Sequence, residues 1–224
     1  MTTVQLLFLC LYVLMLVSYF FAETSGNFPR RAVNKIVLAA MFLLCGIVAY
    51  LHIGNMDGRL IILLGLVFAF LGDITLLWDM KKAGFLFGAA SLLFLVGEIG
   101  LLIRCRVPFR WIFPVLLLAG SLFGFMMLMN SIGKIPFVEK GGKKYAVYLA
   151  VITLCGSQGF VLFIQAGCAS VMLFGLGLCC IMASDYFLTV DTYYEHKNWI
   201  LRTNSGLYFI GVLLVACSLG LPLV

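Results

Sequence analysis

The chain has 224 residues, of which 64% are hydrophobic and only 11% are charged. Soluble globular domains carry about 25% charged residues, so this composition excludes a soluble protein and indicates an integral membrane protein. The formal net charge of +6 comes without a basic patch among exposed aromatic residues. We therefore expect attraction to anionic membrane lipids and no binding of nucleic acid.

Eight segments are long and apolar enough to cross a bilayer, which takes roughly 17 to 25 residues per helix. In chain order they cover about 4–21, 33–51, 60–78, 84–103, 109–130, 145–164, 168–190 and 204–222. The first has no basic residue before it and exceeds the apolar region of a signal peptide, so we interpret it as a helix. The short connections leave no room for a soluble domain. The sequence predicts an all-α, polytopic membrane protein with eight transmembrane helices in a single domain, 1–224.

Lysine and arginine are unevenly distributed between the two sides of this predicted bundle. The connections that follow the odd-numbered spans carry eleven of these residues, and the opposite side carries four. Cytoplasmic loops are enriched in Lys and Arg. We therefore expect a multi-pass protein with both termini on the non-cytoplasmic side, in a membrane that the sequence does not specify.

Two acidic residues lie near the same end of the third and seventh spans. Aligned on Asp73 and Asp185, the two segments share the pattern D-x-x-L-x-x-D, and the acids are 112 residues apart. This offset suggests two parallel four-helix repeats, 1–112 and 113–224, although so short a match also arises by chance. In either case both spans run toward the cytoplasmic side. Each acid is expected about five residues, roughly 7 to 8 Å, before that end.

An acid inside a span is costly and usually faces the bundle interior or a wet cavity. Asp73 and Asp185 are therefore candidate functional groups. The alternative is a structural acid, paired with a basic residue or hydrogen-bonded to a neighbouring helix. Asp79 and Asp191 follow six residues later and face another direction. We expect those two side chains to meet water at the helix ends.

Glu98 is a third acid within a predicted span. The fourth span begins near Phe85 on the cytoplasmic side, which places Glu98 some 20 Å deep, closer to the outer face. It is a candidate proton-relay group, a partner for Arg104 or Arg106, or part of a deep lipid slot. The sequence leaves these three roles open.

Other polar residues are predicted at the depth of the two aspartates. They are Asn34, Lys35, Asn130, Ser131, Tyr145, Tyr148, Asn204, Ser205 and Tyr208. Such residues are individually more often interfacial anchors or helix caps, but together they predict a polar vestibule. The eight cysteines are scattered without a C-x-x-C motif, and the two histidines lie near span ends. We therefore expect no metal site and no cofactor.

Short motifs in the third, sixth, seventh and eighth spans match the pattern of a known family. The matching residues are Gly72, Asp73, Tyr148, Gly177, Ser184, Asp185 and Tyr208. With these residues the chain resembles the YhhN-like, or lysoplasmalogenase, family of eight-span membrane proteins. The likeness in number and order of spans covers most of the chain.

The chain also departs from the pattern of that family. Its fourth span usually carries a His, with a Phe four residues before it and a Tyr three residues after it. Here Phe94 is kept, but Glu98 and Leu101 occupy the other two places. In the eighth span, Gly211 and Val212 stand near the place of an Ala-Gln pair. The departures mark a divergent member.

The resemblance implies hydrolysis of the vinyl ether bond of lysoplasmalogens to a fatty aldehyde and a glycerophospho-base. Protonation of a vinyl ether at carbon creates an oxocarbenium ion, which water then attacks. One carboxyl must therefore hold a proton while another is ionised. Two close, buried carboxyls meet this need because their pKa values move apart from each other. Asp73 and Asp185 are the expected catalytic pair.

Six residues are expected to bind the lysophospholipid substrate. They are Lys35, Glu98, Tyr148, Arg202, Asn204 and Tyr208. Lys35 or Arg202 would meet the headgroup while the chain lies between helices. The sequence leaves the headgroup, the chain and the oligomeric state open.

Two other classes of function remain alternatives at this stage. Intramembrane acids also serve proton- or cation-coupled transporters, and lipid binding without chemistry would use the same residues. The spans of Asp73 and Asp185 show no interruption that would break the helix near the acids, although nearby glycines permit bends. A purely structural membrane partner is the third option, and it would tolerate Asn at both positions.

Overall fold

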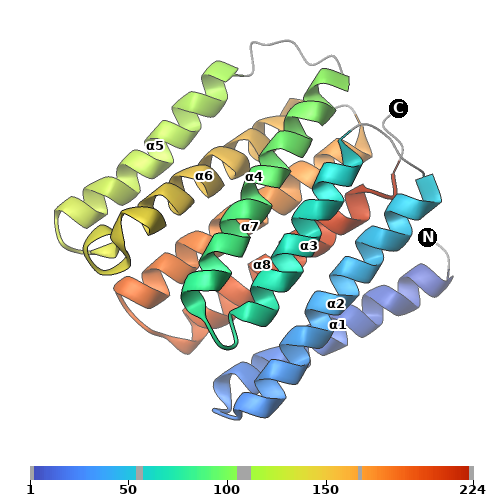
Figure 1. Ribbon diagram of the computed structural model, residues 1–224, viewed down its shortest axis with the longest axis horizontal. Helices are drawn as coiled ribbons and strands as arrows, with labels where there is room; N and C mark the ends of the chain where they lie inside the picture. Colours follow the sequence, from blue (N-terminus) through green and yellow to red (C-terminus); the bar gives the residue numbers. More distant parts are fainter. Residues whose placement is uncertain (1–2, 54–57, 105–111, 166–167, 222–224) are drawn as a thin grey trace.

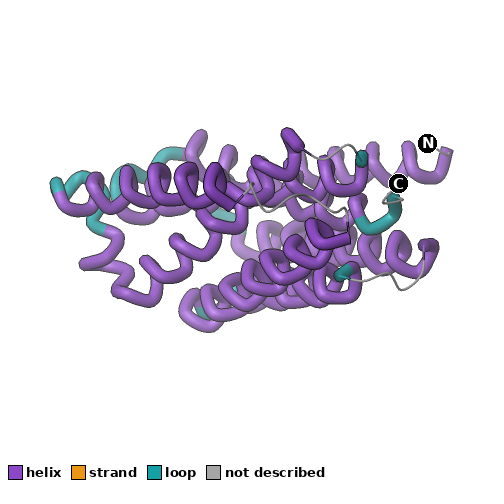
Figure 2. The backbone as a smooth tube through the Cα atoms, turned by 90° about the horizontal axis from the view of Figure 1, so that it is seen from above, coloured by secondary structure: helices purple, strands orange, loops and turns teal. Residues whose placement is uncertain are grey.

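The computed structural model describes residues 3–53, 58–104, 112–165 and 168–221, and within these ranges it contains eight helices and no strand (Figure 1). The helices are α1 (Thr3–Thr24), α2 (Phe28–Ile53), α3 (Arg59–Thr75), α4 (Met80–Arg104), α5 (Ile112–Ser131), α6 (Phe137–Gln165), α7 (Ala169–Tyr193) and α8 (Asn198–Ser218). Each corresponds to one expected span. Among the described residues, the connections between helices are short turns and loops, drawn in teal in Figure 2.

Seven of these helices are long and apolar enough to cross a membrane. The remaining one, α3, has 17 residues, which is the lower end of the length that a span needs. The prediction of an all-α, multi-pass integral membrane protein is confirmed. The orientation of the termini stays a prediction.

The helices pack mainly along the chain order. α7 lies against both α6 and α8, α3 lies against α4, and α2 contacts α1, α3 and α8. α5 lies at one side of the bundle, and α1 and α2 lie at the other (Figure 1). α2 contacts α8, and α6 contacts α4. In two repeated halves α2 would correspond to α6 and α8 to α4, so a repeat would give this pair of contacts. The duplication itself stays a prediction.

Glycines allow close approach where the site is built. A Cβ added at Gly177 of α7 would lie 2.7 Å from the carbonyl oxygen of Gly211 on α8. On α3, a Cβ at Gly72 would lie 2.8 Å from the ring of Phe87 on α4. Real Cβ atoms do not come that close to other atoms, so any larger residue would push these helices apart. The first contact holds α8 against α7, which carries Ser184, and the second holds α4 against α3 next to Asp73.

The two aspartates differ in their distance from the helix ends, contrary to the sequence-based expectation of about five residues for each. α3 ends at Thr75, so Asp73 is two residues from its end, or about 3 Å. α7 continues to Tyr193, so Asp185 is eight residues from its end, or about 12 Å. α3 is shorter than expected because the chain turns after Thr75 toward Asp79, which accepts a hydrogen bond from the Lys82 N–H at 3.1 Å and caps α4.

Candidate functional site

Asp73 is held by residues from two other helices. Its carboxylate is 1% exposed. The Nζ of Lys35 on α2 lies 3.3 Å from Oδ1, and the hydroxyl of Tyr208 on α8 donates to Oδ2 at 2.7 Å. Lys35 is itself buried, so the ion pair is shielded from water. Three helices therefore meet at this carboxylate.

Asp185 has a similar environment without a cation. It lies on α7 with 6% exposure, and the hydroxyl of Tyr148 on α6 donates to its Oδ2 at 2.7 Å. One turn before Tyr148, the hydroxyl of Tyr145 lies 2.9 Å from Oγ1 of Thr189 on α7. These two contacts join α6 to α7 on either side of the carboxylate. Among the described residues no ion pair to Asp185 occurs.

α8 connects the two acid sites. Its Tyr208 donates to Asp73, and its Asn204, one turn earlier, accepts a hydrogen bond from Ser184 at 2.6 Å. Ser184 directly precedes Asp185 in the chain. The Tyr208 hydroxyl is close enough to Asp185 to interact with it electrostatically. The two aspartates thus belong to one polar region around the first half of α8.

The aspartates do not form a hydrogen-bonded pair in the part of the chain that the structure describes. Each carboxylate accepts from its own tyrosine, and α3 and α7 are not among the closely packed helix pairs. Direct contact between Asp73 and Asp185 therefore stays a prediction.

α4 contributes an apolar wall that sequence reasoning missed. The Phe87 ring packs edge-on against the Tyr208 ring, with centroids 5.9 Å apart, and also covers Gly72. Next to it, a Cβ added at Gly88 would meet the Tyr148 ring at 3.8 Å. Neighbouring residues of α4 thus touch both tyrosines. No sequence signal selected Phe87, which is one of 20 phenylalanines in the chain.

A third buried acid lies beside the Lys35–Asp73 pair. Glu23, near the end of α1, accepts hydrogen bonds from Tyr19 at 2.8 Å and from Ser205 of α8 at 2.7 Å. It also interacts electrostatically with Lys35. Sequence reasoning missed Glu23 because an acid at the end of a span is an ordinary boundary residue. The available signal was Tyr19, which lies four residues earlier on the same helix face.

The remaining expected substrate-binding residues are more dispersed. Arg202 is exposed and donates to Thr24 of α1 at 2.9 Å, so it lies at the boundary rather than against an aspartate. Glu98 is 0% exposed, and within the described residues neither of its carboxyl oxygens has a hydrogen-bond partner. It is ten residues beyond Gly88 on α4, or about 15 Å along the helix. Glu98 is therefore outside the aspartate site.

Glu98 is instead close to the buried thiol of Cys155 and the half-buried thiol of Cys179. The side chains of Arg104 and Arg106, its other expected partners, lie outside the described residues. Asp191 pairs with His196 beyond the end of α7, at 3.0 Å. Of the described His, Cys, Asp and Glu residues, no three are grouped so as to hold a metal ion.

Comparison with known proteins assigns the chain to a family. The family model named YhhN matches residues 31–219. This range includes both aspartates and the side chains that bind their carboxylates, Lys35, Tyr148 and Tyr208. α1, with Glu23, lies outside the match. No curated protein and no solved structure matches the chain. Because the model covers most of the chain, including both aspartates, the protein belongs to the YhhN family.

Proposed function

We propose that the protein is a membrane-embedded hydrolase that cleaves the vinyl ether bond of lysoplasmalogens. The products are a fatty aldehyde and a glycerophospho-base. The observation that carries this proposal is the pair of buried aspartates, each accepting a hydrogen bond from a tyrosine at 2.7 Å. Membership of the YhhN family is consistent with a lysoplasmalogenase-like membrane protein. Two carboxyls in one site suit a reaction that needs an acid and a base.

The partners of the two aspartates suggest their roles. Lys35 lies 3.3 Å from Asp73, and a nearby positive charge stabilises a carboxylate. Asp185 has the Tyr148 hydroxyl but no cation among the described residues. We therefore assign Asp185 as the proton donor. Asp73 is assigned as the carboxylate that stabilises the cation and activates water.

The first step transfers the proton of Asp185 to the vinyl carbon that does not carry oxygen. The π electrons of the double bond form the new C–H bond, and an oxocarbenium ion results. Its positive charge lies on the oxygen and the adjacent carbon, where the Asp73 carboxylate stabilises it. Asp73 then removes a proton from the water that adds to that carbon, which gives a hemiacetal.

The second step breaks the hemiacetal. Asp185, now a carboxylate, takes the proton of the hemiacetal hydroxyl, and the carbonyl of the aldehyde forms. The C–O bond to glycerol breaks, and the glycerol oxygen takes the proton from Asp73. Both aspartates return to their starting forms, and one water is consumed. Tyr148 and Tyr208 hold the two carboxylates in place throughout.

The continuity of α3 and α7 argues against transport. Both helices are unbroken through their aspartates, over Arg59–Thr75 and Ala169–Tyr193. Substrate sites in secondary transporters are typically built from discontinuous helices. The residue with non-helical dihedral angles inside α6 is Gly142, near the start of that helix and before Tyr145. The structure thus lacks a broken helix at either aspartate.

The test is release of aldehyde from a lysoplasmalogen by the purified protein in detergent. Asp73→Asn and Asp185→Asn should each lower the rate by about a hundredfold or more, the usual contribution of a general acid or base. Asp191→Asn is the matched control, because this acid of α7 pairs with His196 away from the site. Thermal melting should show that all variants are folded. Wild-type activity in either of the first two variants would refute the proposal.

A further inference from the structure

Two buried acids from different helices share the ammonium group of Lys35. This group forms the ion pair with Asp73 of α3 at 3.3 Å, and it also interacts electrostatically with Glu23 of α1. α1 and α3 both pack against α2, which carries Lys35, but they are not among the closely packed helix pairs themselves. Lys35 therefore lies between the two acids.

The two carboxylate oxygens of Asp73 have different surroundings. Oδ2 accepts the hydrogen bond from Tyr208 at 2.7 Å. Oδ1 lies 3.3 Å from Nζ of Lys35, yet within the described residues it accepts no hydrogen bond. A charge-assisted N–H···O bond usually measures about 2.7 to 2.9 Å, so the ammonium is held back from Oδ1. Oδ1 is therefore the oxygen of Asp73 that can take a proton from water.

Glu23 is itself held firmly in place. It is buried, and its Oε1 accepts hydrogen bonds from Tyr19 at 2.8 Å and from Ser205 of α8 at 2.7 Å. Its Oε2 is buried too, without a hydrogen-bond partner among the described residues. Two cations of α2, Lys35 and the half-buried Arg31, interact with this carboxyl, and nearby cations stabilise a carboxylate. Glu23 can therefore attract the Lys35 ammonium toward α1.

We propose that Glu23 is a positioning residue, which draws the Lys35 ammonium away from Oδ1 of Asp73 and so keeps that oxygen free to act as a base. Without the charge of Glu23, Lys35 closes onto Oδ1 and donates a hydrogen bond to it. A carboxylate oxygen that already accepts such a bond is a weaker base, so it removes a proton from water more slowly. The inference rests on the proposed function for this reaction, and it extends the site to α1, outside the family match.

The first variant is Glu23→Gln, which removes the charge but keeps an oxygen that can accept from Tyr19 and Ser205. The kcat of aldehyde release should fall about tenfold, as for the loss of one charge that acts across an ion pair. KM should stay within about twofold, because Glu23 does not touch the substrate. Glu23→Asp keeps the charge on a shorter side chain, so kcat should fall only about threefold; this variant decides the test if Glu23→Gln does not fold. Glu139→Gln, at an exposed acid in the first turn of α6, is the matched control and should change neither constant.

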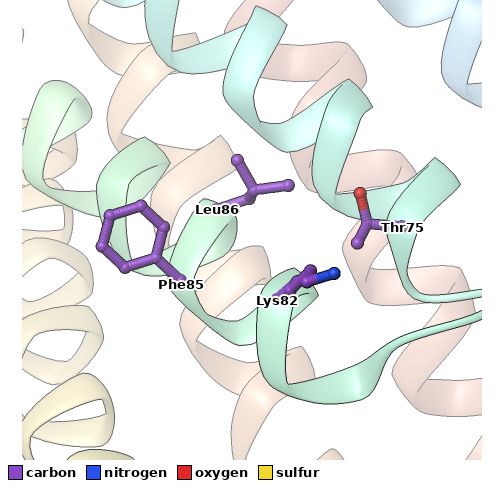
Figure 3. A pocket seen from close by; sticks show the side chains of 4 residues that line it. All are labelled: Thr75, Lys82, Phe85 and Leu86. Atoms are coloured by element: carbon purple, nitrogen blue, oxygen red, sulfur yellow. The ribbon is translucent and has the colours of Figure 1, made fainter.

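Double variants show whether Glu23 acts through Lys35. In the background of Lys35→Met, Glu23→Gln should change kcat by less than about twofold, because the ammonium that Glu23 positions is gone. Lys82 is the matched lysine, since its side chain is 78% exposed. Figure 3 shows Lys82 beside Thr75, the last residue of α3, on one side of a surface groove. In the background of Lys82→Met, Glu23→Gln should keep its full effect of about tenfold.

Melting temperatures of the same variants report on Lys35 without any reaction. Lys35→Met alone leaves two carboxyls without their cation, whereas in the background of Glu23→Gln it leaves only one. The fall in melting temperature caused by Lys35→Met should therefore be smaller in that background, by about 2 °C or more. Equal falls in the two backgrounds would overturn the inference, because Glu23 and Lys35 would then not interact.

The outcomes separate this inference from the hydrolase proposal. Aldehyde release by wild type, with an unchanged kcat in Glu23→Gln, would overturn the positioning role and leave the hydrolase. A loss of kcat that is as large with Lys35→Met as without it, or a rise in KM at constant kcat, would also overturn the positioning role. No aldehyde release by wild type would overturn the hydrolase; the smaller fall in melting temperature would then still support the hold of Glu23 on Lys35, and equal falls would overturn it.

Discussion

The ion pair between Lys35 and Asp73 should be the most sensitive point of the site. Both side chains are almost fully buried, and Nζ and Oδ1 are 3.3 Å apart. Breaking a buried ion pair by removing one partner destabilises a protein by about 3 to 5 kcal/mol. For a protein of this size, 1 kcal/mol corresponds to roughly 2 to 4 °C in melting temperature. Lys35→Met should therefore lower the melting temperature by about 6 to 20 °C.

The same substitution should also abolish most aldehyde release. A buried carboxylate that loses its cation neutralises by taking up a proton, and a neutral Asp73 cannot stabilise the oxocarbenium ion or accept a proton from water. We expect a fall in rate of about a hundredfold. In the double variant Lys35→Met with Asp73→Asn, the melting temperature should recover because no carboxyl has to take up a proton, whereas activity should stay low.

Melting temperature and aldehyde release measured on the same preparations test this reasoning. Lys197→Met is the control, because Lys197 and Glu195 form an exposed pair at 2.7 Å. Such pairs are worth about 1 kcal/mol or less, so the control should shift the melting temperature by no more than roughly 4 °C. If Lys35→Met melts like this control and keeps its activity, the role given to the buried ion pair is wrong.

Three further substitutions have expected outcomes. Tyr148→Phe removes the hydroxyl that donates to Asp185 and should slow aldehyde release about tenfold or more. Asp185 becomes a carboxylate as it gives up its proton, and a hydrogen bond to a charged group is worth roughly 1.5 to 3 kcal/mol; an unchanged rate would contradict this role. Glu98→Gln should raise the melting temperature by a few degrees with activity unchanged, because burying a carboxyl without a hydrogen-bond partner costs free energy. Loss of activity would show that Glu98 acts in the reaction. Gly177→Ala should destabilise the protein by about 1 to 3 kcal/mol, because the added Cβ would lie 2.7 Å from the Gly211 oxygen. An unchanged melting temperature would instead show that α7 and α8 can move apart without cost.

The sequence predicts the helices well because a bilayer restricts what can cross it. Each apolar run corresponds to one helix, and Asp73 and Asp185 can be selected because acids are rare in such runs. The position of the end of α3 was wrong by three residues, since the tight turn capped by Asp79 shortens the helix. Local patterns report length and polarity, so they place elements better than they place their ends.

The neighbours of each acid could not be predicted from the sequence. The sequence selected Tyr148, Tyr208 and Lys35 as polar residues of one depth, but nothing in their spacing shows which aspartate each one contacts. That pairing depends on how α2 and α8 pack against α3 and how α6 packs against α7, which is a tertiary property. Glu23 was missed for the same reason, because its importance comes from Ser205, on α8.

α8 organises the site through residues on two successive turns. Asn204 bonds Ser184 of α7, Ser205 bonds Glu23 of α1, and Tyr208 bonds Asp73 of α3. One helix thereby fixes three others around the aspartates. A change at this end of α8 should therefore affect both acid sites together.

The departures from the YhhN pattern lie outside this hydrogen-bonded region. Glu98 is about 15 Å along α4 from the residues that touch the tyrosines, and Gly211 follows Tyr208 by three residues and packs against Gly177 of α7. Gly211 therefore serves the close packing of α7 on α8, and Glu98 lies near the thiols of Cys155 and Cys179. The residues that match the family include both aspartates and the two tyrosines, Tyr148 and Tyr208, that donate to their carboxylates. The departures therefore leave the two aspartates and their tyrosine partners unchanged, so they give no ground against the hydrolysis proposed above.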